Sequence, residues 1–440
     1  MAYKHLKIVL LLFGMTVMLT GCGKKDGQQR KETGDDGRTV ITLGDYDYNG
    51  ASYYIGDAVN QFNKTSSDYR IESIEYSGRE DPVSAFNMDV AAGNCPDILL
   101  VGNSYLDRVI HAGLLEDLKP YLEGDAQLHP EDFLDNILEA CTTDGHLYYL
   151  GNDYGITSIF GKKEQLAGYE DGWTREEMLA YAKSADVPLF YWDDKISLFM
   201  YIMDSGITDF VDWDQRKGLF QTDLFREILE YCNKGVKNSD RTAIDPEAVT
   251  EFKQDKCRLG MTSFQDFMCI EDTTRFYGTD LTFVGTPREE PCISEIRFNM
   301  NIGMYTKSPY KEQAWEFIKL LYTKEAQHEL ASSGLSVRKD VFAMQKKASI
   351  ATEPYVDEMG ETQEPIDCEA PNFKYTPLTQ EEADLVEKLV TSAKYCSRND
   401  NTIEQIVYEE VSAYFNGDCT IDRVGETINS RVETYMNENR

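Results

Sequence analysis

The sequence has few basic residues for its length and very few histidines. Lys and Arg number 44 against 77 Asp and Glu, giving a formal net charge of −33 at pH 7, and only five His occur among 440 residues. A chain this acidic repels nucleic acid phosphates and anionic lipid headgroups. The composition therefore argues against DNA or RNA as a partner, and it predicts that charge does not hold the protein at a membrane.

Motifs that carry catalysis or metal binding are also missing. No C-x-x-C, G-x-S-x-G, H-E-x-x-H or G-x-G-x-x-G occurs, and the histidines lie far apart in the chain. Residues 45–50 begin like a calcium-binding EF-hand loop, but Gly56 stands where the bidentate Glu should be. Residues 155–162 are one residue too long for a phosphate-binding loop. We therefore expect no catalytic residue, no cofactor and no metal site, although a carboxylate pair of a glycosidase stays possible among 77 acids.

Long apolar runs are confined to the start of the chain. Lys4 and Lys7 precede an apolar run from Ile8 to Leu19, which is too short for a stable membrane-spanning helix and is typical of a signal peptide. The run ends in Leu-Thr-Gly-Cys22, which resembles the bacterial lipobox. This predicts a signal peptide over 1–21, lipidation of Cys22 and a flexible tether over 22–38, because residues 23–38 contain no aliphatic or aromatic side chain. A plain secreted protein is the alternative.

Ten cysteines occur, and lipidation of Cys22 leaves an odd number in the body of the chain. Disulfides form outside the cell, yet a body of this size does not need them for stability. We expect mostly free, buried thiols.

What the sequence does contain is an alternation of strand and helix patterns. Strands are predicted at 40–43, 69–76 and 98–101, and helical spacing follows each of them. The run Ile98 to Val101 is purely apolar, which is typical of a strand buried on both faces. The rhythm continues in the second half and predicts an α/β protein with mainly parallel sheets. Capping boxes predict helix starts at Thr174, Thr379 and Thr402, and Pro309 is placed at the start of another helix.

Several short stretches, in order along the chain, resemble the family 1 extracellular solute-binding proteins of ABC importers, especially the carbohydrate-binding branch. They are Ala58-Val-Asn-Gln-Phe-Asn-Lys64, Gly93-Asn-Cys-Pro-Asp-Ile98, Ala112-Gly-Leu-Leu-Glu-Asp-Leu118, Asp144-Gly-His-Leu-Tyr148, Gly172-Trp-Thr174 with Glu177, Tyr310-Lys-Glu-Gln-Ala-Trp-Glu-Phe-Ile318, Gly334-Leu-Ser-Val-Arg338 and Tyr414-Phe-Asn-Gly417. The segment Lys256 to Met261 departs from the family pattern, because Arg258 and Gly260 replace small-residue positions.

The resemblance implies a two-lobed fold like that of periplasmic binding proteins. Each lobe would be a mainly parallel sheet flanked by helices, and crossing segments would form a hinge near 150–155, 295–302 and 330–345. We expect a first lobe of residues 39–150 with about 300–340, and a second lobe of residues 151–299 with about 345–440.

A sugar offers hydroxyls at its rim and an apolar C–H face, so its site needs polar groups beside aromatic rings. We expect these side chains in loops at strand ends. Asp45 and Asn103 would bond hydroxyls, Arg79 or Arg297 would bridge two oxygens, and Tyr46, Trp192 and Phe264 would stack. For each residue a purely structural role is the alternative. The full candidate set is Asp45, Tyr46, Asp47, Tyr48, Arg79, Asn103, Tyr105, Tyr154, Trp192, Phe264, Gln265, Arg297 and Asn299.

The function that the resemblance implies is a monomeric receptor, anchored by its lipid on the outer face of the cytoplasmic membrane. It would capture a sugar or oligosaccharide between its lobes and deliver it to an ABC permease in a transient contact. Two alternatives stay open: a surface-anchored enzyme that degrades glycans, and the same receptor role for a solute other than a sugar.

Overall fold

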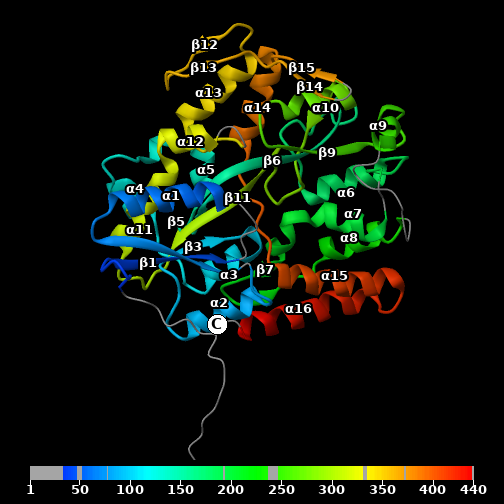
Figure 1. The fold of residues 1–440 in the computed structure, drawn as a ribbon. Coiled ribbons are helices and arrows are strands. Elements are labelled where there is room, and N and C mark those ends of the chain that lie inside the picture. The colour runs from blue at the N-terminus through cyan, green and yellow to red at the C-terminus, as the bar shows by residue number, and fades with distance from the viewer. Residues whose placement is uncertain are drawn as a thin grey trace, which may run out of the picture.

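The computed structural model describes residues 33–46, 52–76, 78–191, 194–235, 246–330, 334–370 and 373–438. Its elements form two lobes (Figure 1): β1, β3, α1 and α11 belong to one half, and α6, α7, α8, α15 and α16 to the other. The two longest strands run between the halves. The two-lobed α/β fold expected from the sequence is present.

The first lobe is built on parallel strands. β1 (Thr39–Tyr46) pairs in parallel with β2 (Tyr69–Glu75) on one side and with β3 (Ile98–Val101) on the other. All four residues of β3 are buried, as the apolar run predicts. Burial of each such aliphatic side chain contributes roughly 1.5–3 kcal/mol, so this strand anchors the lobe.

Two long antiparallel strands carry the chain between the lobes. β6 (Leu150–Lys162) pairs with β11 (Glu295–Met304) over most of its length, and β11 pairs in turn with β3 of the first lobe. These two strands contain the crossings expected near residues 150–155 and 295–302. Because they belong to one hydrogen-bonded sheet, the sheet continues from one lobe into the other.

The second lobe corrects one expectation. Its described strands β9 (Leu259–Phe264) and β10 (Leu281–Phe283) both pair antiparallel with β6, so this part of the sheet is not mainly parallel. The reason is that β6 runs out of the first lobe through the whole second lobe, and the later strands return along it.

Helix starts follow local capping chemistry. Thr174 and Thr379 form the predicted capping boxes with Glu177 and Glu382. The prediction at Thr402 was wrong: Asp400 caps that helix, because its carboxylate accepts hydrogen bonds from two backbone N–H groups, 2.9 and 3.0 Å away. The helix predicted from Pro309 begins only at Lys311.

The remaining elements complete the two lobes and the helices above the crossing. In the first part of the chain these are α1 (Ser52–Thr65), α2 (Pro82–Ala91), the short 3-10 helix η1 (Asn103–Tyr105), α3 (Leu106–His111), α4 (Lys119–Gly124), η2 (Pro130–Asp132), α5 (Asp135–Ala140), β4 (Thr142–Thr143) and β5 (His146–Leu147). Then follow α6 (Arg175–Ser184), α7 (Lys195–Met203), η3 (Asp204–Phe210), β7 (Val211–Asp212), β8 (Lys217–Gly218), α8 (Asp223–Cys232), α9 (Pro246–Lys253) and α10 (Cys269–Tyr277). The last part contains α11 (Lys311–Ile318), η4 (Lys319–Tyr322), α12 (Lys324–Leu330), α13 (Lys339–Ile350), β12 (Tyr355–Val356), β13 (Thr362–Gln363), β14 (Cys368–Ala370), β15 (Phe373–Tyr375), α14 (Gln380–Ser392), α15 (Asn401–Asn416) and α16 (Ile421–Glu438).

The cysteines of the body are mostly buried, as expected. Six of them are buried, whereas Cys269 and Cys419 are partly exposed and Cys368 is exposed. Within the described part of the chain, no helix combines the length and the apolar character that a membrane crossing requires.

Candidate functional site

The carboxyl ends of the first-lobe strands meet the crossing strands at one edge. Tyr46 at the end of β1 lies opposite Val101 of β3, Val101 lies opposite Asn301 of β11, and Asn301 lies opposite Gly151 of β6. Residues that follow β1 and β3 are therefore placed beside the crossing strands. Ligands of open α/β sheets bind beyond such strand ends.

Asp45 and Arg79 belong to this edge. The Asp45 carboxylate accepts a hydrogen bond from the backbone N–H of Tyr76, just after β2. The Arg79 guanidinium lies 4.6 Å from the centre of the Tyr76 ring and donates to the carbonyl of Glu75. Both side chains therefore help to shape the loop after β2, and their contact with a ligand stays a prediction.

Asn103 ties β3 to β11. Its amide nitrogen donates to the carbonyl of Phe298 at 2.8 Å, and its amide oxygen accepts from Asn301 at 2.7 Å. Asn301 also donates to the carbonyl of Val101. These bonds fix the end of β3 against the crossing strand, which gives Asn103 a positioning role whether or not it also reaches a ligand.

One face of β11 carries a row of polar side chains. Glu295, Arg297, Asn299 and Asn301 alternate with the buried residues Ile296, Phe298, Met300 and Ile302, as the period of two in a strand requires. Arg297 and Asn299 are exposed, whereas the residues at the two ends of the polar row are buried. The row therefore presents an arginine and an amide to solvent at the crossing.

A small cavity lies at the second-lobe end of this row. It has a volume of about 200 Å³, and its lining includes Arg297, Thr157 of β6, Tyr201 of α7 and Met261 of β9. Gly155 lies opposite Arg297 in the ladder. A Cβ atom at Gly155 would approach the carbonyl oxygen of Phe264 to 2.8 Å and the amide of Gln265 to 3.3 Å, so the glycine lets Gln265 lie over the strand beside Arg297.

A buried charge network supports the cavity wall. The Arg288 guanidinium donates to Glu295 at 2.6 Å and to Asp209 at 3.2 Å, and Thr286, which lines the cavity, donates to the other Glu295 oxygen at 2.9 Å. Burial opposes the charge of Arg288, but the two carboxylates outweigh it and raise the pKa of this side chain above its usual value. The pairing keeps both signs of charge compensated inside the protein.

Asp153 is the most unusual side chain at the crossing. It lies on β6 between the ladder pairs that join Tyr154 to Phe298 and Asn152 to Met300, and its φ is +50°. Its Oδ1 atom is buried and has no hydrogen-bond partner among the described residues. Burial raises the pKa of Asp153, while the neighbouring Asn299 amide lowers it in part.

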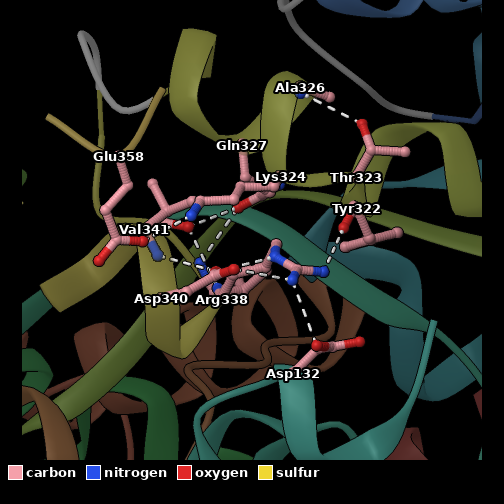
Figure 2. Close-up of polar contacts among 12 residues, drawn as sticks. Asp132, Tyr322, Thr323, Lys324, Ala326, Gln327, Arg338, Asp340, Val341 and Glu358 are labelled. Carbon is pink, nitrogen blue, oxygen red and sulfur yellow. Dashed lines mark hydrogen bonds and ion pairs between the residues drawn. The ribbon is translucent and has the colours of Figure 1, made fainter. Parts of the chain in front are cut away.

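The third connection between the lobes packs directly against Asp153. A Cβ atom at Gly334 would lie 2.0 Å from Asp153 Oδ1, so only glycine allows this approach. Arg338 fixes the segment that follows: it donates to Asp340 and Asp132 and to the carbonyl of Tyr322, at 2.9, 3.2 and 3.1 Å (Figure 2). A fixed segment therefore holds Asp153 from one side.

The structure separates the predicted residues into three groups. It brings Gln265, Arg297 and Asn299 together on the crossing strands. It buries Tyr154 and Phe264 completely, with their rings 6.0 Å from Phe298 and Phe283 respectively, so both belong to the core beneath the site. Tyr105 is half-buried against the core. Asp47, Tyr48, Trp192, the Tyr46 side chain and Cys22 lie outside the described residues.

Sequence reasoning missed Asp153, Thr157 and Tyr201. Asp153 stands within the crossing segment that the family resemblance locates, so a polar residue inside a predicted strand was the available signal. Tyr201 lies in an apolar helix, and nothing in that pattern distinguishes it from a core residue. The gathered side chains offer hydrogen-bond donors from Arg297, Gln265 and Asn299 and an acceptor from Asp153.

Comparison with known proteins decides the family. Residues 57–354 match the profile of the bacterial extracellular solute-binding proteins. The chain belongs to this family. The family consists of extracellular binding proteins, which agrees with the absence of motifs for catalysis noted in the sequence.

Individual relatives of this solute-binding protein are distant. A galactooligosaccharide-binding protein of Bacillus subtilis is 25% identical over 180 residues, which cover 41% of this chain and 40% of that protein. The match thus spans about two fifths of the curated relative. A family 1 solute-binding protein of Alicyclobacillus acidocaldarius superposes with a TM-score of 0.52 at 17% identity, covering 91% of this chain and 98% of that one. An ABC substrate-binding protein of Listeria monocytogenes, in complex with cycloalternan, gives 0.52 at 15% identity, with 91% and 99% covered.

Proposed function

We propose that this protein is a receptor that captures a sugar or oligosaccharide between its lobes and delivers it to an ABC permease. The observation that carries the proposal is the exposed polar row on the crossing strands, where Arg297, Asn299 and Gln265 gather near Asp153 at the carboxyl ends of β1 and β3. Planar amide and guanidinium groups bond the adjacent hydroxyls of a sugar ring.

The relatives support this class of ligand. The Bacillus subtilis relative is named for galactooligosaccharide binding, and the Listeria structure contains cycloalternan. The lobes would be residues 39–150 with about 300–340 and residues 151–299 with about 345–440. Lipidation of Cys22, an outer-face location and a transient, monomeric encounter with the permease complete the proposal, and all of these follow from the sequence resemblance.

A thermal-shift screen over mono- and oligosaccharides tests the ligand class, with galacto-oligosaccharides included. A sugar at 100 times its Kd stabilises the folded protein by about 2.7 kcal/mol through mass action. We expect Arg297→Ala to abolish this shift. Arg226→Ala is the matched control, because Arg226 pairs with Asp422 at the surface, away from the crossing strands.

Two results would contradict the proposal in different ways. A response to peptides or phosphate without any response to sugars would remove the carbohydrate assignment and leave the receptor role. Release of new reducing ends from an incubated glycan would replace the receptor with an enzyme. Small-angle scattering supplies an independent measurement, because ligand binding to the closed form should lower the radius of gyration.

A further inference from the structure

A second cluster of polar side chains lies away from the crossing strands. His328 belongs to α12, and Asp357 and Glu361 lie in the turn between β12 and β13. One ligand atom from each of these three residues lies within 4.8 Å of the other two. They line a cavity of about 620 Å³ that Glu325 and Glu329 also border, so the surroundings of the histidine are strongly acidic.

Asp357 is held in place before any ion arrives. Its Oδ1 atom accepts hydrogen bonds from the backbone N–H groups of Met359 and Glu361 at 2.8 and 2.9 Å. Its Oδ2 atom accepts from the Gln363 amide at 2.7 Å and faces His328. An outer hydrogen bond of this kind orients a carboxylate that coordinates a metal.

The distances fit coordination better than a direct ion pair. His328 Nε2 lies 3.3 Å from Asp357 Oδ2, which is longer than the roughly 2.7–2.9 Å of a charge-assisted hydrogen bond. Two ligands on a tetrahedral ion with bonds of about 2.0–2.1 Å stand about 3.3–3.4 Å apart. Glu361 Oε2 lies 4.0 Å from the other ring nitrogen, and its side chain is 65% exposed, so it is free to turn toward the ion.

A neighbouring contact brings the turn to the helix. Lys324, one turn before His328, pairs with Glu358 of the same turn at 2.7 Å (Figure 2). The cluster therefore joins two segments whose spacing is already fixed, which reduces the ordering that a bound ion would need.

We propose that His328, Asp357 and Glu361 bind a divalent first-row transition cation that clamps the β12–β13 turn onto α12. One imidazole and two carboxylates form a ligand set that Zn²⁺ accepts, and imidazole disfavours Ca²⁺ and Mg²⁺, which take oxygen ligands. The proposal does not depend on which solute the protein carries.

Calorimetric titration of the full chain with Zn²⁺ alone, after treatment with a chelator, tests the site. We expect one ion per chain in the wild type and loss of that ion in His328→Gln and in Glu361→Gln. Gln363→Ala should weaken binding by roughly 10- to 100-fold, because it removes the hydrogen bond that orients Asp357. Glu361 is exposed, so its substitution leaves the fold intact.

The chain contains a matched control. His146 Nδ1 lies 2.8 Å from Asp117 Oδ2, which makes a similar histidine–aspartate pair at an exposed position. His146→Gln should bind Zn²⁺ as the wild type does. The proposal is overturned if the wild type binds no Zn²⁺, if His328→Gln and Glu361→Gln bind it unchanged, or if His146→Gln loses as much affinity as His328→Gln.

Discussion

At the scale of single residues, Asp153 combines a cost to the fold with a candidate role in binding. Its buried oxygen has no partner among the described residues, and its backbone adopts a left-handed conformation. Conformations of this kind persist where the surrounding structure enforces them, and they cluster at functional sites. A ligand hydroxyl that donated to this oxygen would satisfy it.

Asp153→Asn should stabilise the protein at neutral pH and weaken ligand binding. Because burial raises the pKa of Asp153, the folded state holds the proton more tightly than the unfolded state, so stability from this group falls as pH rises above its usual pKa. Removing the charge should therefore raise the melting temperature at pH 7, with the gain vanishing below about pH 4. Affinity for the identified sugar should fall by roughly ten- to a hundredfold, since a hydrogen bond to a charged group is lost.

Differential scanning calorimetry at several pH values, with binding titrations at pH 7, measures both effects. Asp135→Asn serves as control, because the Asp135 side chain is 91% exposed. A lower melting temperature for Asp153→Asn at pH 7, or unchanged affinity, would contradict the assignment.

Sequence reasoning located part of the site at this scale. Gln265, Arg297 and Asn299 were predicted, because polar residues in or just after predicted strands stand where ligands bind. Asp153 was not, because its conformation and its approach to Gly334 depend on a contact between segments far apart in the chain. Tyr154 and Phe264 were predicted to face the ligand, but their burial could not be read from residue type alone.

At the scale of elements, one carboxylate joins α4 to α11 and η4. Asp125 accepts hydrogen bonds from the Trp315 indole at 2.9 Å and from the Lys319 ammonium at 3.0 Å, and from the backbone of Gln127 at 2.8 Å. Burial raises its pKa, but these bonds outweigh burial and lower the pKa to about 2. The packing of these helices is therefore linked to pH.

Asp125→Asn should destabilise the protein by about 2 kcal/mol above pH 4. The lowered pKa means that the stabilisation is complete above the usual pKa of the carboxyl and is lost as pH falls toward 2, so the variant and the wild type should converge there. Urea unfolding at pH 7, 4 and 3 measures the difference. Asp255→Asn is the control, since that half-exposed carboxylate pairs with Lys162 at the surface, and its loss should cost less than about 1 kcal/mol.

Element boundaries were predictable where one local interaction decided them. Thr174 and Thr379 have no competitor at the N-terminus of their helices, and both predicted boxes are present. At Thr402 the nearby Asp400 is the stronger acceptor, so the helix starts one residue earlier. Local patterns alone do not rank such competing caps.

At the scale of the whole molecule, the alternation of strands and helices was enough to predict the α/β class. The direction of the second-lobe strands was not predictable in the same way. It follows from β6, which continues for 13 residues through both lobes and imposes antiparallel pairing on the strands that return to it. Strand length of this kind depends on tertiary pairing more than on residue type.

The first lobe should fail to fold when it is cut from the rest of the chain. A fragment of residues 39–150 lacks β11, which pairs with β3, so a fully buried apolar strand would lose one partner and expose an edge. We expect this fragment to aggregate. Joining residues 39–150 to residues 294–345 through a short linker restores β11 and should give a monomer with cooperative unfolding. Size-exclusion chromatography and circular dichroism distinguish these outcomes, and a soluble, cooperatively folded 39–150 fragment would refute the expectation.

The shared sheet also limits how such a protein diversifies. Because β11 comes back from the far half to complete the near one, neither half corresponds to a single uninterrupted stretch of gene, and recombination cannot swap one half as a cassette. New specificities would have to arise by point substitution or loop exchange on a retained framework. The ends of β1 and β3 and the exposed side of β11 are where such changes alter the guest without disturbing the strands that join the two halves.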